Sequence, residues 1–320
     1  MKYLITGGAG FIGVNLAQKL SENKKNKIYL MDNLSKDINN KKFSELIKNK
    51  NIIFLKKDLS NKASYPNIFN FDYIFHFAAI LGVKTVIDNP FITLKENIKT
   101  SINLIDFSKK QKKLKKLCFT STSEVYAYTL ENKLARYPTP ENIDFIISKD
   151  FNPRSAYLLS KIVVEYLINY SRLNFVIFRP HNIFGPDMGF SHVIPQLTKK
   201  ILNKKRKNIL VNNSNHKRTF CYIDFAIDLI VKISLDKKST KKIYNIGSPD
   251  KDISILQLAK KISKILRLKK KLLPSKKLKD NSPKKRRPDM NKSLNYIKTK
   301  HNFEEGLKET VLWYKKYYQN

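Results

Sequence analysis

Tyr157 and Lys161 are side chains that together could do acid–base chemistry. They stand four residues apart, so on a helix they share one face. A lysine ammonium beside a phenol favours the phenolate, and we expect it to lower the pKa of Tyr157 from its reference value of about 10. Such a phenolate is a general base for a sugar or alcohol hydroxyl. The pair alone is more typical of a solvated helix face, so its interpretation depends on the elements around it.

A glycine cluster at the N-terminus predicts a dinucleotide site. Four of the nine glycines fall within residues 7–13, after the apolar run Tyr3-Leu4-Ile5 and before an amphipathic helical pattern. A strand that enters a helix through such a turn brings backbone N–H groups and the positive helix N-terminus to a diphosphate. The next predicted strand ends at Asp32, roughly 20 residues on, where a carboxylate suits a free ribose 2′-hydroxyl. The sequence therefore predicts NAD rather than NADP, with contacts from Gly7, Gly10, Phe11, Ile12, Gly13, Asp32 and Asn33.

Three further strand ends carry residues that suit such a ligand, because ligands of parallel sheets bind beyond the carboxyl ends of the strands. Asp58-Leu59 is placed to meet the adenine amino group, although Asp58 could equally be a helix N-cap. His76-Phe77-Ala78-Ala79 offers small residues against which a cofactor can pass. Thr122-Ser123-Glu124 places hydroxyls and a carboxylate beside the expected nicotinamide.

The order of apolar runs predicts a Rossmann-type, doubly wound parallel α/β sheet with a smaller C-terminal lobe. A helix around 224–234 and a strand at 242–246 indicate that the sheet domain resumes late in the chain. The stretch 128–153 lacks periodicity and is expected to be a long loop near the site. The other predicted strands lie at 2–6, 27–31, 51–55, 72–77, 115–121 and 174–179.

The composition is that of a globular protein, with 320 residues of which 42% are hydrophobic. No apolar stretch approaches the ~20 residues that span a bilayer, so we expect a cytoplasmic protein without a membrane partner. Cys118 and Cys221 have no metal-ligand spacing, and neither a metal nor a disulfide is expected.

The net charge of +37 permits non-specific attraction to polyanions. A compositional bias towards Lys, Asn and Ile is the alternative explanation, but it does not account for the scarcity of Asp and Glu. No zinc finger, aromatic-interleaved RNA motif or basic tail is present, so no specific nucleic-acid partner is expected.

Together these residues resemble the extended short-chain dehydrogenase/reductase family, and within it the nucleotide-sugar epimerases, dehydratases and decarboxylases. The resemblance covers nearly the whole chain. Ala127 departs from it, because the family usually has glycine there. The matching segments are residues 6–13, Asp32-Asn33-Leu34, residues 76–79, residues 121–126, Tyr157 with Lys161, and residues 179–186.

The resemblance implies two domains, one that binds the cofactor and one that binds the substrate. Residues 1–183, resumed by about 217–249, would form the NAD-binding domain, and 184–216 with 250–320 the nucleotide-sugar-binding lobe. Asn97 would lie near the cofactor. Asn182 has a rival role in capping local backbone, and Arg286 and Arg287 could instead belong to a solvated basic run. The implied substrate contacts are Asn182, His192 and Val193 for the nucleotide sugar, and Arg218 with Arg286 or Arg287 for its diphosphate. A homodimer is expected.

The implied reaction passes through a 4-keto sugar. Tyr157 would take the proton of the sugar 4-hydroxyl, Thr122 would hydrogen-bond that oxygen, Lys161 would bind the nicotinamide ribose, and the C4 hydride would move to NAD. The keto sugar then takes the hydride on its other face (4-epimerase), loses water (4,6-dehydratase) or loses carbon dioxide (UDP-glucuronate-type decarboxylase).

The breadth of the family alone, and no particular residue, favours the 4-epimerase. The triplet Thr122-Ser123-Glu124 instead resembles the same position in decarboxylases and some dehydratases. A non-catalytic NAD-binding scaffold is the alternative of another class, and intact Thr122, Tyr157 and Lys161 argue against it.

Overall fold

The computed structural model describes residues 1–35, 41–205, 207–275 and 283–319. These residues form two compact units. Unit 1 contains Met1–Val125, Ile147–Arg179 and Ile227–Tyr244, and unit 2 contains Tyr126–Ile146, Pro180–Ala226 and Asn245–Asn320. Among the described residues, no helix is long and apolar enough to cross a bilayer.

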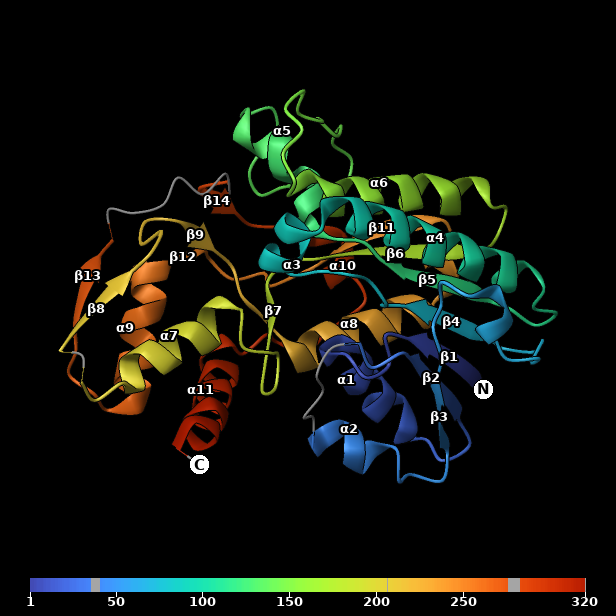
Figure 1. Cartoon of the computed structure of the whole chain (residues 1–320), viewed down its shortest axis with the longest axis horizontal. Coiled ribbons are helices and arrows are strands. Elements are labelled where there is room, and N and C mark those ends of the chain that lie inside the picture. Colours follow the sequence, from blue (N-terminus) through green and yellow to red (C-terminus); the bar gives the residue numbers. More distant parts are fainter. Residues whose placement is uncertain (36–40, 206, 276–282, 320) are drawn as a thin grey trace. The chain divides into compact units, whose positions relative to one another are not determined.

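A seven-stranded sheet is the framework of unit 1 (Figure 1). Its order is β11-β6-β5-β4-β1-β2-β3, and the neighbouring pairs from β6 to β3 are parallel. The chain thus reverses its direction of winding between β1 and β4, which confirms the doubly wound α/β fold and places a ligand crevice at their carboxyl ends. The strands are β1 (Lys2–Thr6), β2 (Lys27–Asp32), β3 (Ile52–Lys56), β4 (Tyr73–His76), β5 (Lys116–Thr120), β6 (Phe175–Pro180) and β11 (Lys242–Ile246).

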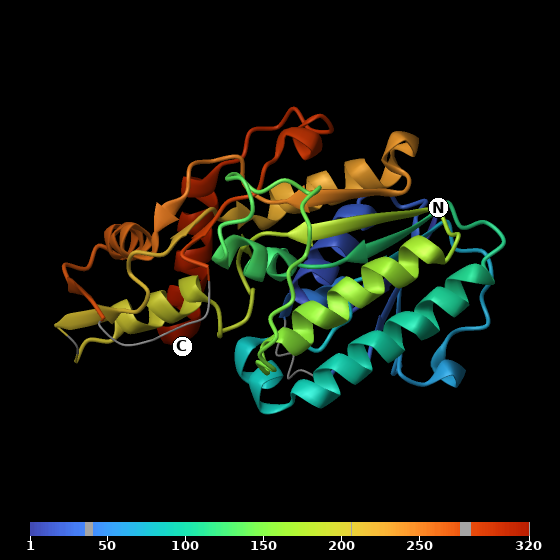
Figure 2. The same ribbon diagram turned by 90° about the horizontal axis from the view of Figure 1, so that it is seen from above.

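Helices cover both faces of this sheet. Helices α4 and α6 lie side by side on one face, and α1 and α8 lie on the other (Figures 1 and 2). Alternate strand residues such as Leu4, Phe119 and Ile177 pack with Leu104 of α4 and Val164 of α6 in a buried core. The helices are α1 (Phe11–Ser21), α2 (Lys41–Leu46), α3 (Val83–Asp88), α4 (Pro90–Lys109), α6 (Ser155–Tyr170) and α8 (Ile223–Leu235), with single 3-10 turns at Lys62–Ser64, Ser123–Tyr126 and Lys237–Ser239.

The described residues of unit 2 are helical, as expected, but they also form three small sheets that the sequence did not predict. Their strands pair as β10-β7, β12-β9-β14 and β13-β8. Most have only two residues, too few to show a hydrophobic period. The elements are α5 (Ala127–Glu131), α7 (Val193–Leu202), α9 (Ile255–Leu266), α10 (Asn291–Leu294), α11 (Phe303–Gln319), β7 (Ile183–Phe184), β8 (Asn208–Val211), β9 (Lys217–Arg218), β10 (Cys221–Tyr222), β12 (Ile253–Ser254), β13 (Lys271–Pro274) and β14 (Lys285–Arg286).

The segment Tyr126–Ile146, expected in the cofactor domain, packs with unit 2. The Tyr126 hydroxyl donates to Asn245 Oδ1 at 3.0 Å, and the Asn245 N–H donates to Glu141 Oε1 at 2.8 Å. Thr139 N–H donates to the Arg287 carbonyl at 2.8 Å. These contacts join residues more than a hundred positions apart, so no local sequence pattern indicates them.

Candidate active site

The glycine turn between β1 and α1 has the shape of a diphosphate cradle. Gly7 has φ +67°, and a Cβ atom there would lie 2.6 Å from Ala78 N. A Cβ atom on Gly13 would collide with the Gly7 carbonyl oxygen. Gly10 is the N-cap of α1. No side chain caps the N–H groups of the first turn of the helix, which begins with Phe11 and Ile12. Uncapped N–H groups at a helix N-terminus bind anions, so the residues present fit NAD.

Asp32 ends β2 beside this turn. Its carboxylate accepts hydrogen bonds from Ala9 N–H at 3.2 Å and from Leu34 N–H at 2.9 Å. Asn33 follows it and accepts from Ser35 N–H at 3.0 Å. A fixed carboxylate in this position is the feature that selects a free ribose 2′-hydroxyl against a 2′-phosphate.

We expect Asp32→Ala to weaken NAD and to narrow its advantage over NADP, because the variant lacks both the acceptor and the like charge that repels a phosphate. Titration of both cofactors into stripped protein measures this. Glu45→Ala, which removes an exposed carboxylate from α2, is the control and should leave both affinities unchanged. Tighter binding of NADP than NAD by the unmodified chain would contradict the assignment.

Other predicted cofactor residues hold backbone near the sheet edge. Asn97 of α4 accepts from Ile80 N–H at 2.7 Å and donates to the Ile80 carbonyl at 3.0 Å, which fixes the chain just after Phe77-Ala78-Ala79. Asp58 accepts from Ser60 N–H at 2.8 Å, so it closes a local turn, and Leu59 beside it is buried. The N-cap of the following 3-10 turn is Asn61, not Asp58.

His76 at the end of β4 is buried and bridges two elements. Its Nδ1 lies 2.8 Å from Thr6 Oγ1, and its Nε2 lies 3.0 Å from Ser101 Oγ. Burial, and then the charge of Lys161, lowers the pKa of His76 to about 3. The imidazole is therefore neutral and serves to join β1 to α4.

The structure brings the five predicted catalytic residues of unit 1 to one corner, where β5 ends and α6 begins. The Lys161 ammonium donates to the Thr120 carbonyl at 2.8 Å and lies 5.8 Å from the centre of the Tyr157 ring. Ser123 and Glu124 follow Thr122 in a 3-10 turn, and Glu124 N–H donates to Thr122 Oγ1 at 3.2 Å. Both Thr122 and Ser123 are buried.

The expected direction of the Tyr157 pKa shift is wrong. Burial raises the pKa of Tyr157, the Glu124 carboxylate raises it further, and only a hydrogen bond with Thr122 lowers it. Lys161 is also buried, which lowers its own pKa to about 7, against the opposing charge of Glu165. The Lys161 ammonium donates to the Thr120 carbonyl and does not lower the pKa of Tyr157, so desolvation of the phenol dominates.

Arg154 is a residue of this corner that the sequence reasoning missed. Its guanidinium lies 3.7 Å from the Glu124 carboxylate, and about a quarter of each side chain is exposed. A basic residue three positions before the candidate base was the available signal, because residues at that spacing share a helix face.

In unit 2, two of the predicted diphosphate ligands stand side by side. Arg218 of β9 and Arg286 of β14 are partners in register, and both are buried. Arg218 donates to the carbonyls of Lys217 and Lys284 at 2.8 and 3.1 Å. Two adjacent buried guanidiniums suit a diphosphate, and burial excludes the solvated-run interpretation for Arg286.

The other predicted substrate residues are placed differently. Asn182 has φ +43° and donates to the Thr219 carbonyl at 3.0 Å, so it takes the backbone role that the sequence left open. His192 is exposed at the N-cap of α7, and Val193 begins that helix.

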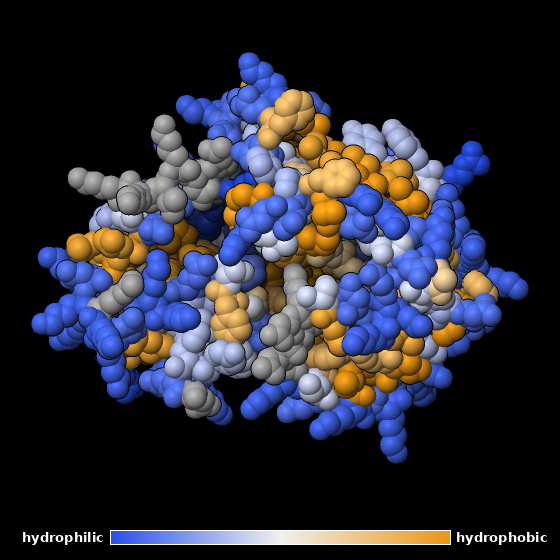
Figure 3. Space-filling view, viewed as in Figure 1, coloured by the Kyte–Doolittle hydropathy of each residue, from blue (hydrophilic) through white to orange (hydrophobic). Residues whose placement is uncertain are grey.

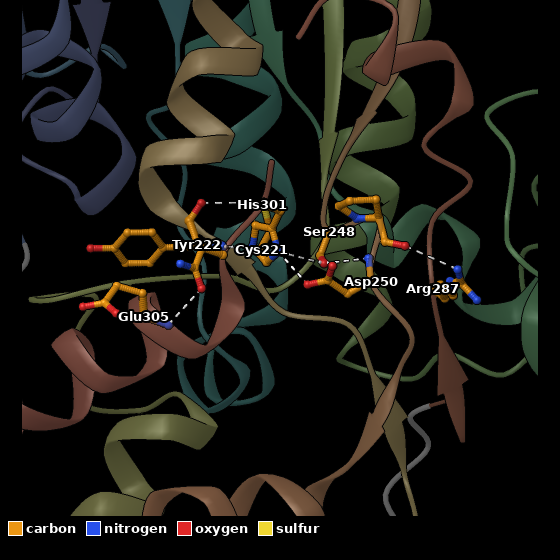
Figure 4. A network of polar contacts seen from close by, with 9 residues as sticks. Cys221, Tyr222, Ser248, Asp250, Arg287, His301 and Glu305 are labelled. Carbon is orange, nitrogen blue, oxygen red and sulfur yellow. Dashed lines mark hydrogen bonds and ion pairs between the residues drawn. The ribbon is translucent and has the colours of Figure 1, made fainter. Parts of the chain in front are cut away.

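Arg287 donates to the Pro249 carbonyl at 3.4 Å and adjoins a polar network that no sequence motif indicated (Figure 4). In it, His301 Nε2 accepts from Tyr222 N–H at 2.9 Å, and Nδ1 lies 2.6 Å from Asp250 Oδ2. Burial opposes ionisation of Asp250, but hydrogen bonds from His301 and Ser248 and the charge of Arg287 hold its pKa below the ordinary value. The network fixes the backbone next to the arginine pair.

Comparison with known proteins agrees with this geometry. The model of the NAD dependent epimerase/dehydratase family matches residues 3–247. A UDP-N-acetyl-alpha-D-glucosaminuronate decarboxylase from Bacillus cytotoxicus is 31% identical over 98% of this chain and 97% of its own. The chain spans 41% of the length of a bifunctional polymyxin resistance protein ArnA from Wigglesworthia glossinidia brevipalpis, and 62% of a dTDP-D-glucose 4,6-dehydratase from Dictyostelium discoideum.

Solved structures share the fold over almost the whole chain. A UDP-glucose 4-epimerase from Thermotoga maritima, with UDP-glucose, has a TM-score of 0.83 at 26% identity and covers 99% of this chain and 100% of its own. A UDP-glucuronic acid 4-epimerase from Bacillus cereus, with UDP-glucuronic acid and NAD, has a TM-score of 0.81 at 25% identity and the same coverage. The chain therefore belongs to the NAD-dependent epimerase/dehydratase family, the nucleotide-sugar branch of the extended short-chain dehydrogenases/reductases.

Proposed function

We propose that this protein oxidises C4 of a nucleotide-bound hexuronic acid and then releases its C6 carboxylate as carbon dioxide, as an NAD-dependent decarboxylase. The observation that carries the proposal is the Glu124 carboxylate beside Tyr157. We assign the cofactor and the reacting groups to unit 1, and binding of the substrate diphosphate to Arg218 and Arg286 of unit 2. The proposal keeps the expectation of a cytoplasmic homodimer.

The first half of the reaction uses Tyr157 and Thr122. The Tyr157 phenolate takes the proton of the 4-hydroxyl while Thr122 Oγ1 hydrogen-bonds that oxygen, and the hydrogen on C4 leaves as hydride. When bound, NAD supplies the hydride acceptor and a positive nicotinamide, which favours the phenolate that the chain alone disfavours. Lys161, held by the Thr120 carbonyl, is placed to bind the nicotinamide ribose.

The second half needs a proton store. In a 4-keto hexuronic acid the carbonyl is β to the C6 carboxylate, so the C5–C6 electron pair can move into an enolate as carbon dioxide leaves. The enolate must then take a proton at C5 from water, and the hydride must return to C4 while the Tyr157 hydroxyl gives its proton back to the C4 oxygen. Glu124 raises the pKa of Tyr157, which favours retention of the first proton until it is needed. Arg154, at 3.7 Å, orients Glu124.

A 4-epimerase, preferred on family breadth, is the second candidate. The similarity to the two solved 4-epimerases supports it. An epimerase only returns the hydride to the opposite face and requires no further carboxylate, whereas Glu124 makes the first deprotonation harder. In a decarboxylase, Glu124 helps Tyr157 to hold its proton during the second half of the reaction. The presence of Glu124 therefore favours loss of carbon dioxide over epimerisation. The long alignment with the Bacillus decarboxylase points the same way.

Glu124→Gln tests the proposal. For a decarboxylase, we expect the hydride step to remain nearly intact while the second step stalls, so that reduced cofactor and a 4-keto sugar accumulate. For an epimerase, the substitution should cost less than about tenfold, below the usual worth of a positioned proton carrier. Stopped-flow absorbance of NADH follows the first step, and mass spectrometry of the products separates loss of carbon dioxide, loss of water and unchanged mass.

Glu131→Gln is the matched control, because Glu131 is an exposed carboxylate at the end of α5. It should leave both steps unchanged. Equal loss of both steps in Glu124→Gln would show that Glu124 only supports the fold of the corner. A product of unchanged mass from the native chain would replace the decarboxylase with the epimerase.

A further inference from the structure

Two segments of unit 2 contain no acidic residue, although the chain as a whole has 26. They are residues 188–223 and 253–279. Both supply elements to one body: β8 pairs with β13, and α7 and α9 pack on each other and on these strands. Acid-free sequence from two distant parts of the chain is thus brought together in space. A bias towards lysine spread evenly along the chain does not produce this arrangement.

Exposed lysines gather at one end of this body. The parallel strands β8 and β13 begin there, directly after Lys207 and at Lys271, and Lys271 N–H donates to the Lys207 carbonyl at 3.2 Å. We call Lys204, Lys205, Lys207, Lys269 and Lys271 the lysine cluster; all five are exposed. Within the described parts of unit 2, none of the five forms an ion pair. Figure 3 shows blue, hydrophilic side chains together with an orange, hydrophobic patch over the region where Figure 1 draws β8 and β13.

An apolar pair accompanies the lysine cluster. Leu210 of β8 and Leu273 of β13 are partners in register, so their side chains lie on the same face of the two-stranded sheet. Leu210 is 56% exposed and Leu273 is half-buried. Proteins that bind nucleic acid contact the phosphates with basic residues and stack the bases on aromatic rings. An exposed leucine makes neither kind of contact. Leucine next to lysine is instead suited to the boundary between lipid headgroups and acyl chains.

We propose that this end of unit 2 docks on the surface of an anionic lipid bilayer. The lysine cluster binds headgroup phosphates, and Leu210 with Leu273 enters the shallow apolar layer beneath them. The inference departs from the expectation of no membrane partner, because that expectation considered only segments that span a bilayer. It is independent of the reaction that the protein catalyses.

Vesicle flotation of the full chain tests the proposal. Phosphatidylcholine vesicles with phosphatidylglycerol should bind the protein, and pure phosphatidylcholine vesicles should not. Each lysine near an anionic bilayer contributes about a fivefold gain in affinity, so changing the whole lysine cluster to Gln should lower partitioning by at least about 100-fold. Added salt should release the native protein, because the interaction is screened.

A second five-lysine variant is the matched control. Lys24, Lys25, Lys48, Lys50 and Lys109 are exposed in unit 1, and their change to Gln removes the same total charge. This control should keep most of the binding. Equal loss in both variants would show that net charge alone attracts the protein and would overturn the docking surface.

Leu210→Ser separates insertion from charge. It should weaken binding several-fold while leaving the salt dependence unchanged. If the substitution has no effect on binding, the apolar part of the proposal is wrong.

A labelled DNA duplex is the competing ligand. The membrane proposal fails if two results occur together. The duplex displaces the native protein from vesicles, and the lysine-cluster variant no longer binds the duplex but still binds vesicles. The surface would then be a nucleic-acid site. Retained NAD absorbance confirms that each variant is folded.

Discussion

Tyr157→Phe is expected to lower turnover by about 10²–10⁴-fold, the usual contribution of a positioned general base. The substitution removes one oxygen from a half-buried ring whose centre lies 5.8 Å from the Lys161 ammonium. The ring packing remains, so the fold and the bound cofactor should be retained. Loss of activity with normal NAD content identifies the hydroxyl as the reacting group.

A pH profile adds a readout that a structural role would not move. Burial and Glu124 raise the pKa of Tyr157, so the phenolate fraction grows as pH rises. The activity of the native chain should therefore increase towards alkaline pH, and the residual activity of Tyr157→Phe should lack this increase. Tyr166→Phe, on an exposed ring of the same helix, is the control. Near-normal turnover in Tyr157→Phe would refute the assignment.

Arg179→Met is expected to destabilise the protein by about 3–5 kcal/mol, the range for removing one partner of a buried ion pair. Arg179 of β6 donates through Nε to Glu165 Oε1 at 3.0 Å and through a second nitrogen to Oε2 at 2.6 Å. The side chains are 2% and 5% exposed. Without Arg179, the Glu165 carboxylate on α6 is left charged and buried.

Urea unfolding followed by far-UV circular dichroism measures this loss. Arg136→Met is the control, because that arginine is 71% exposed and lies 3.9 Å from Asp289; exposed pairs contribute about 0–1 kcal/mol. Combining Arg179→Met with Glu165→Leu should restore much of the stability, because no charge then remains buried. A change in Arg179→Met no larger than that of the control would show that the pair is not a stabilising contact.

Local patterns predicted the sheet well. Each predicted strand from 2–6 to 174–179 lies within two residues of an observed one, because a buried parallel strand is a continuous apolar run. The glycine turn was equally readable, since Gly7 and Gly13 have no room for a Cβ atom.

What the sequence did not predict depends on contacts between distant residues. The attachment of Tyr126 to Asn245, the bridge by His301 and the two-residue strands have no period to detect. The pKa of Tyr157 was assigned the wrong direction for the same reason. Spacing identifies Lys161 as a neighbour, but it cannot give the depth at which both groups are buried.

Two residues in the middle of α6, one helical turn apart, bond to different strands. Lys161 bonds to the last residue of β5, and Glu165 bonds to β6. Rotation of the helix by a single residue, about 100° about its axis, would break both ties at once. The orientation of Tyr157 is therefore set when the chain folds, and catalysis need not spend substrate-binding energy on ordering it. Looser helix anchoring should consequently reduce turnover even in variants that keep every reacting group.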